Sequence, residues 1–153
     1  MTFDTAIAIG PKYAWIYYQK SVAYLKRGLL TQGIQLLNKA VGLDPQSHIC
    51  YRAYWFYSHK SYQACIDDLE LYYSTYGGYV EFTPGGEHEM RMLLGMSCAA
   101  MNNLDKATVV ISDYLNNLKN EMQLRGEDYY ILGVLYYRNG QYKEAAQALL
   151  KQI

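Results

Sequence analysis

The sequence predicts an all-α protein, a right-handed α-solenoid in which antiparallel helix pairs stack one after another. The first observation is a repeated phrase: a large apolar residue, an alanine three later and a proline five after that, which ends at Pro11 and again at Pro45. Proline cannot continue a helix, so each phrase marks a helix end. The second is composition: 51% of the 153 residues are hydrophobic and only three are proline, which suits one packed domain.

Apolar spacing and breaker residues predict the helices in order. Asp44-Pro45 marks a turn between repeats, and Asn102-Asn103 and Asn139-Gly140 mark turns within helical hairpins. The expected helices are 2–10, 13–27, 30–43, 47–59, 62–75, 87–101, 104–120, 127–139 and 142–152.

The end of the chain carries the most specific motif. It reads Tyr129-x2-Leu132-Gly133-x2-Tyr136, then Gly140-x-Tyr142-x2-Ala145-x3-Leu149. Gly133 and Ala145 lack bulk where two helices must approach closely, and Tyr136 and Leu149 fill the space between them. This stretch resembles the tetratricopeptide repeat (TPR) family, whose pattern it matches at nearly every position.

Earlier segments carry the same phrase with more variation, since Lys20 and Arg52 stand where leucine is expected. Aligned on it, one domain (1–153) holds a half repeat at 1–12 and repeats near 14–45, 46–87, 88–125 and 126–153. The second repeat includes an insertion at 76–86, where glycine and proline flank an alternating run. We expect a short β-hairpin arm or an irregular turn there, with Tyr79 and Phe82 as candidate contact residues.

Several function classes are disfavoured. Fourteen Lys and Arg balance fourteen Asp and Glu, which argues against a general nucleic-acid binder. No apolar run approaches the roughly 18 residues of a membrane span. The cysteines and histidines lack metal-ligand or redox spacing, so we expect no metal, no cofactor and no catalytic site. Widely spaced cysteines, and a start without a basic, apolar leader, favour the cytoplasm.

The resemblance to TPR proteins implies that the first helix of each repeat lines a concave groove that holds a peptide or helix. Tyrosine, present 18 times, and tryptophan suit such contacts because they bury large area with few torsions to freeze. The Lys/Asn/Arg clamp by which some relatives grip an acidic tail is absent from these positions. The corresponding groove positions are Trp15, Tyr18, Val22, Cys50, Tyr51, Tyr54, Tyr57, Met92, Met96, Tyr130, Val134, Tyr137 and Arg138.

Three hypotheses about function remain. The leading one is a non-enzymatic protein–protein interaction module with an aromatic groove. The alternative is a structural or self-assembly segment of a longer repeat protein, because the sequence opens on the second helix of a repeat and closes without a polar capping helix. Such uncapped ends predict possible homo-oligomers. The third is an enzyme or ligand sensor that uses the insertion as a lid. The aromatic run 51–57 is equally consistent with simple burial.

Overall fold

The computed structural model describes residues 2–77, 86–116 and 126–151, and every regular element in these ranges is an α-helix. In chain order the helices are α1 (Phe3–Ile9), α2 (Ala14–Lys26), α3 (Leu30–Leu43), α4 (Pro45–Ser58), α5 (Tyr62–Tyr76), α6 (Gly86–Ala100), α7 (Leu104–Asn116), α8 (Gly126–Arg138) and α9 (Tyr142–Leu150).

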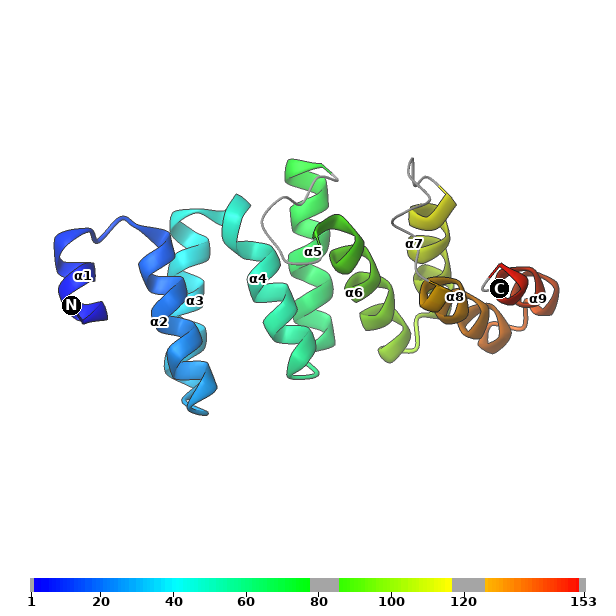
Figure 1. The fold of residues 1–153 in the computed structure, drawn as a ribbon, viewed down its shortest axis with the longest axis horizontal. Helices are drawn as coiled ribbons and strands as arrows, with labels where there is room; N and C mark the ends of the chain where they lie inside the picture. Colours follow the sequence, from blue (N-terminus) through cyan, green and yellow to red (C-terminus); the bar gives the residue numbers. More distant parts are fainter. Residues whose placement is uncertain (1, 78–85, 117–125, 152–153) are drawn as a thin grey trace.

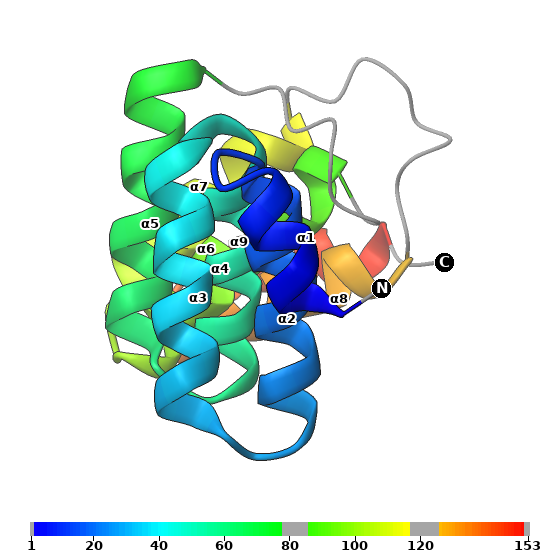
Figure 2. The same ribbon diagram turned by 90° about the vertical axis from the view of Figure 1, so that its left-hand side faces the viewer.

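The helices form an elongated α-solenoid (Figure 1). After α1 come four antiparallel pairs: α2–α3, α4–α5, α6–α7 and α8–α9. The second helix of one pair packs on the first helix of the next, α3 on α4, α5 on α6 and α7 on α8, and α4 also contacts α6. Seen along the stack, α3 and α5 lie on one side and α2 on the other (Figure 2). The first helices therefore have a side that their partners do not cover.

The predicted helices are present, with most ends within one or two residues of expectation. The fourth begins at Pro45 rather than 47, because proline suits the first helical turn and the Asp44 carboxylate accepts from the Ser47 amide at 3.2 Å. The seventh was expected to reach 120; α7 is described to Asn116, and 117–120 lie outside the described residues.

The structure describes only the boundaries of the insertion expected at 76–86. Tyr76 is the last residue of α5 and Gly86 the first of α6, so both boundary residues are helical. Residues 78–85, which include Tyr79 and Phe82, lie outside the described residues. The β-hairpin and the irregular turn both stay predictions.

Two columns of small, buried residues hold the pairs together. The first helices contribute Ser21, Ala53, Gly95 and Gly133, and the second helices contribute Gly33, Cys65, Ala107 and Ala145. A Cβ on Gly133 would lie 2.7 Å from Leu149 Cγ, and one on Gly95 would overlap Ile111. Neighbouring side chains thus occupy the space that a larger residue would need.

Each pair turns through one residue with a left-handed backbone: Gly28, Lys60, Asn102 and Gly140, with φ between 60° and 76°. Glycine adopts this conformation at no steric cost, and asparagine tolerates it. Lys60 does so without either advantage. The same turn geometry therefore recurs although only two of the four turns carry the residue that favours it.

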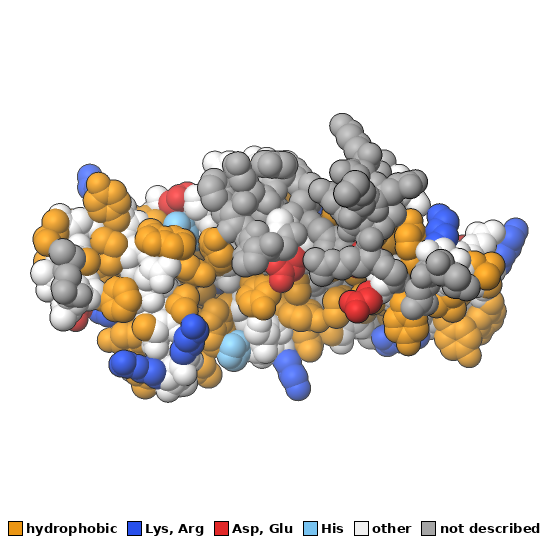
Figure 3. Space-filling view, viewed as in Figure 1, with side chains coloured by type: hydrophobic (Ala, Val, Ile, Leu, Met, Phe, Trp, Pro, Cys, Tyr) orange, Lys and Arg blue, Asp and Glu red, His pale blue; other side chains and the backbone are white. Residues whose placement is uncertain are grey.

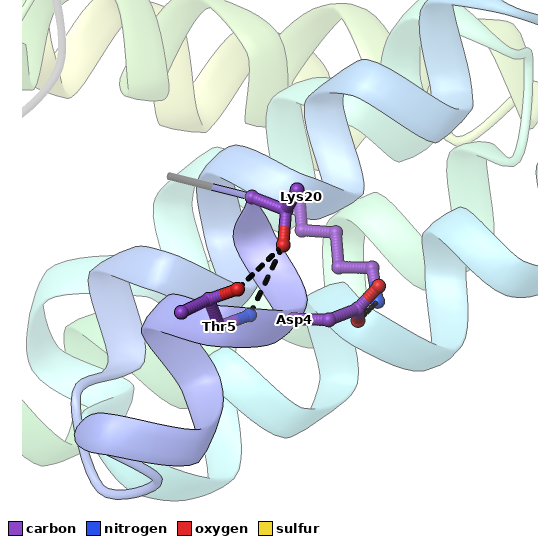
Figure 4. Close-up of polar contacts among 4 residues, drawn as sticks. Asp4, Thr5 and Lys20 are labelled. Carbon is purple, nitrogen blue, oxygen red and sulfur yellow. Dashed lines mark hydrogen bonds and ion pairs between the residues drawn. The ribbon is translucent and has the colours of Figure 1, made fainter.

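The two charged residues at the expected leucine position each bridge neighbouring helices. Lys20 Nζ on α2 lies 2.6 Å from Asp4 Oδ1 on α1 (Figure 4). Arg52 on α4 donates from Nε and Nη2 to the two carboxylate oxygens of Asp68 on α5, at 2.8 and 2.7 Å, and from Nη1 to Asn38 Oδ1 at 2.8 Å. Long charged side chains can pack their methylene stems against apolar neighbours. Where a leucine would make an apolar contact, Lys20 and Arg52 each form a directional ion pair instead.

Gly95→Ala tests the small-residue columns. The added methyl group would overlap Ile111, so the free energy of unfolding should fall by about 1–3 kcal/mol in urea denaturation. Gly42→Ala is the matched control, because nothing lies within 4 Å of its added Cβ on α3. That change should raise stability by about 0.5–1 kcal/mol through helix propensity. Equal effects at both sites would contradict the packing argument.

Candidate binding surface

A hollow of about 430 Å³ opens between the first helices of two successive pairs, α2 and α4. We name it the α2–α4 hollow. Four of the predicted groove residues meet there, together with five that the prediction did not include. Its lining is Tyr18, Val22, Leu25, Lys26, Tyr51, Tyr54, Trp55, Ser58 and His59.

Helical spacing explains why these residues converge. Tyr18, Val22 and Leu25 follow one another at intervals of four and three on α2, which places them on one face. On α4, Tyr54 and Trp55 follow Tyr51 by three and four residues, which places them beside it on one face. Because α2 and α4 are first helices of adjacent pairs, these two stripes lie side by side and leave a trough between them.

An aromatic cluster continues the hollow toward the start of α2. Ring centroids of Tyr18 and Tyr51 lie 4.6 Å apart, and those of Trp15 and Tyr18 lie 5.0 Å apart. Trp15 remains 54% exposed and Tyr54 47% exposed. Large aromatic surface is therefore available to a partner although the rings already hold one another in place.

His48 lies beneath this cluster and was not predicted as a site residue. It is buried, its ring centroid is 5.7 Å from that of Tyr18, and its Nδ1 lies 3.0 Å from the Asp44 carbonyl oxygen. A carbonyl only accepts, so Nδ1 carries the proton. Within the described part of the chain, the buried Nε2 has no hydrogen-bond partner. The spacing of three from His48 to Tyr51 is the signal that could have placed it here.

The other end of the hollow is polar and basic. The ring of His59 stacks on Trp55 with centroids 3.3 Å apart, and Nδ1 donates to the Trp55 carbonyl oxygen at 3.0 Å. Lys26 belongs to the lining, which contains no aspartate or glutamate. An interval of four from Val22 to Lys26 and from Trp55 to His59 would have identified both residues from the sequence.

Tyr18 and Tyr51 stay neutral near pH 7. Burial raises the pKa of Tyr18 above its ordinary value, and the neighbouring Tyr51 adds to the rise. Burial likewise raises the pKa of Tyr51, with a further contribution from Cys50. Each phenol consequently offers a hydroxyl group and an apolar ring rather than a charge.

Two predicted lining residues are core residues instead. Met92 is 7% exposed and Cys50 2% exposed, and both belong to the main apolar cluster. α6 lies in the middle of the stack, in contact with α4, α5 and α7, and most of its circumference is covered. Met96 is half-buried and accepts from the Tyr57 hydroxyl at 3.8 Å. Tyr57, whose pKa burial raises, packs beside Tyr62 rather than in the hollow.

The predicted residues of the last repeat form a separate surface on α8. Tyr130, Val134 and Tyr137 are 52%, 37% and 65% exposed, and Arg138 is also exposed. Their spacing puts Tyr130, Val134 and Tyr137 on one helical face. Tyr137 contacts Tyr142 with ring centroids 5.5 Å apart. The α2–α4 hollow includes none of these residues.

The sequence pattern of the tetratricopeptide repeat family matches residues 16–47 and 129–153, which include the hollow's α2 half and the exposed face of α8. The chain therefore carries tetratricopeptide repeats in these two segments. The matched ranges contain α3, α9 and most of α2 and α8. No curated protein matches the sequence.

The TPR chain is similar in fold to solved structures of MamA. One, described as the crystal structure of MamA, is 20% identical with a TM-score of 0.76, and the match covers 98% of this chain and 82% of that one. MamA residues 41 to the end from Desulfovibrio magneticus RS-1 give 17% identity and a TM-score of 0.71, over 92% and 74% of the two chains. At this identity the likeness concerns the fold.

Among the described residues, no group of three His, Cys, Asp or Glu could hold a metal ion. Among the same residues, no helix combines the length and apolar character needed to cross a membrane. The three cysteines are free and buried, and the cytoplasmic location inferred from the sequence stays a prediction.

The buried thiols allow a direct test of the TPR core. Burial raises the pKa of Cys50 to about 12 and of Cys65 to about 11, and it also raises the pKa of Cys98. The reactive species is the thiolate, and at about pH 8 about one molecule in ten thousand is ionised at Cys50 and about one in a thousand at Cys65. Ellman's reagent should therefore leave the folded chain unmodified and modify all three cysteines in guanidinium. Rapid modification of one cysteine in native buffer would contradict this packing.

Proposed function

We propose that this TPR protein is a non-enzymatic interaction module that binds a peptide or helix along its first helices. Its repeats and its fold are those of a protein–protein interaction scaffold. The observation that carries the finer proposal is the α2–α4 hollow, where predicted groove residues from two repeats line one trough.

The shape of the hollow suits a side chain presented by a peptide. Its volume of about 430 Å³ lies within the about 300–1,000 Å³ of typical ligand sites. The hollow is partly open to solvent, so a chain can continue beyond an anchored residue. Rings supply apolar contact, and tyrosine hydroxyl groups can hydrogen-bond the peptide backbone.

The exposed face of α8 gives a second contact region for the same ligand. Tyrosine and arginine are among the residue types that dominate binding energy at interfaces, and this face carries Tyr130, Tyr137 and Arg138. Two weak contacts on one rigid solenoid strengthen each other when the ligand reaches both. A single continuous peptide on both regions is part of this proposal.

Self-assembly is the second candidate, and exposed apolar side chains favour it. Phe3 and Trp15 help to line a hollow of about 490 Å³ between α1 and α2. At the other end of the stack Leu150 is 70% exposed and Tyr142 65% exposed. A helix of a second copy could cover either surface, so light scattering across a concentration series distinguishes this candidate from a monomeric peptide binder.

Tyr54→Ala tests the hollow. A random peptide display library is selected on the immobilised full chain, and the affinity of the best peptide is measured by fluorescence polarisation. Removing the exposed ring should weaken binding at least about tenfold, as for an aromatic hot-spot residue. Leu71→Ala on the second helix α5, where the side chain is 54% exposed, is the control and should bind within about twofold of the wild type.

Circular dichroism should show that both variants keep their helices. Recovery of no peptide from the selection, or equal weakening by both substitutions, would count against the proposed function.

A further inference from the structure

The balanced total charge conceals a division along the chain. Residues 1–66 contain seven Lys and Arg but two Asp and Glu, whereas residues 67–153 contain seven against twelve. The first segment covers α1 to α4 and the start of α5, which is one end of the elongated solenoid (Figure 1). The basic half and the acidic half are therefore separated in space.

Internal pairing leaves most of the basic charge unbalanced. Asp4 is paired with Lys20, and Arg52 is paired with Asp68 from the acidic half. The remaining acid, Asp44, caps α4. The other five cations of the basic half are Lys12, Lys26, Arg27, Lys39 and Lys60, and no carboxylate among the described residues forms an ion pair with them.

Three of these five cations lie at one end of the α2–α4 hollow. Lys26 lines it, Arg27 follows directly at the end of α2, and Lys60 follows His59 at the end of α4. Lysine and arginine side chains gather beside hydrophobic surface at the lower end of α2 (Figure 3). These cations also interact favourably with the C-terminal ends of α2 and α4. The lining of the hollow contains no aspartate or glutamate that would neutralise their charge.

We infer that the α2–α4 hollow binds a peptide segment in which an apolar anchor residue is followed by acidic residues. This inference rests on the proposed function and adds the chemistry of the ligand. The anchor enters between Tyr18, Tyr51 and Tyr54, and the carboxylates lie against Lys26, Arg27 and Lys60. Unlike-charge attraction accelerates encounter and rejects basic peptides, while the aromatic rings supply affinity.

A peptide fits these observations better than a nucleic acid does. Nucleic-acid binding draws its affinity from a stripe of many phosphate contacts. Here Lys12 lies before α2, at the opposite end of that helix from Lys26, and Lys39 lies on the second helix α3. Three clustered cations beside an apolar hollow match a short acidic segment.

The peptide selection described above provides the first readout. Peptides recovered on the wild-type chain should show an apolar position followed by Asp and Glu at least about threefold above their frequency in the library. Peptides that bind but show neutral or basic flanks would overturn this inference and leave the proposed function standing. Recovery of no peptide would overturn both.

Charge substitution provides the second readout. The variant Lys26→Glu/Arg27→Glu/Lys60→Glu should bind the selected peptide at least about tenfold more weakly at low salt, and the difference should shrink as salt screens the charges. The control Lys12→Glu/Lys39→Glu/Lys143→Glu changes the net charge equally at exposed positions outside the hollow, and should lose at most about threefold. Equal losses in both variants would overturn the assignment to the hollow.

A glutamine version of the first variant guards against unfolding. Lys26→Gln/Arg27→Gln/Lys60→Gln removes the charges without reversing them, and thermal unfolding followed by circular dichroism shows which variants are folded. It should bind with intermediate affinity.

Two competitors complete the experiment. A labelled oligothymidylate that binds as tightly as the peptide, and displaces it, would replace the inference with a nucleic-acid site. The chain could also form dimers at the concentrations of the assay, and the acidic peptide could dissociate them. That result would show that the acidic half of a second copy occupies the hollow, and it would also overturn the inference.

Discussion

Close approach of paired helices at small residues is the constraint on which the rest of this structure depends. At the same position of each first helix stands Ser21, Ala53, Gly95 or Gly133, and each is buried. A larger side chain there would separate the helices and remove dispersion contacts along the whole pair. Once this register is set, the orientation of every other side chain on the helix is fixed as well.

The binding surface is a consequence of that register. With Ser21 and Ala53 turned toward the core, Tyr18 and Tyr54 are rotated onto the uncovered side of their helices. Packing of α3 on α4 then determines how far apart α2 and α4 lie, and thus the width of the hollow. Helix packing places the aromatic residues of the hollow, and their mutual ring contacts restrict their rotamers before any ligand binds.

The fold was predictable from sequence because its signals are local. Proline, paired asparagines and apolar spacing all act within a few residues, so the helix positions followed directly. Lys20 and Arg52 show the limit of such reasoning. Each meets a carboxylate sixteen residues away, but Lys20 reaches back to α1 whereas Arg52 reaches forward to α5. A periodic pattern gives the position of a charged residue and does not reveal the direction in which it pairs.

The candidate site was predictable only where a first helix keeps one side uncovered. Tyr18, Val22, Tyr51 and Tyr54 met as expected, because α2 and α4 each keep a side that no neighbour covers. Met92 is buried rather than part of a groove, because three helices surround α6. This burial follows from the place of α6 in the stack and not from the sequence of α6. His48 was missed although it precedes Tyr51 by three residues, because the prediction of groove positions rested on aromatic and apolar side chains and not on histidine.

Total charge was the least informative of the sequence quantities, for a physical reason. Screening limits the reach of a surface charge to about 8–10 Å at physiological ionic strength. In an elongated solenoid, most charges of one end lie beyond that distance from the other end, so opposite excesses do not cancel at either surface. A partner at α2 and α4 is exposed to the basic excess there, as it would be on a basic protein. In a repeat protein, charge is therefore an attribute of each repeat, and partner classes are better judged repeat by repeat than from the whole chain.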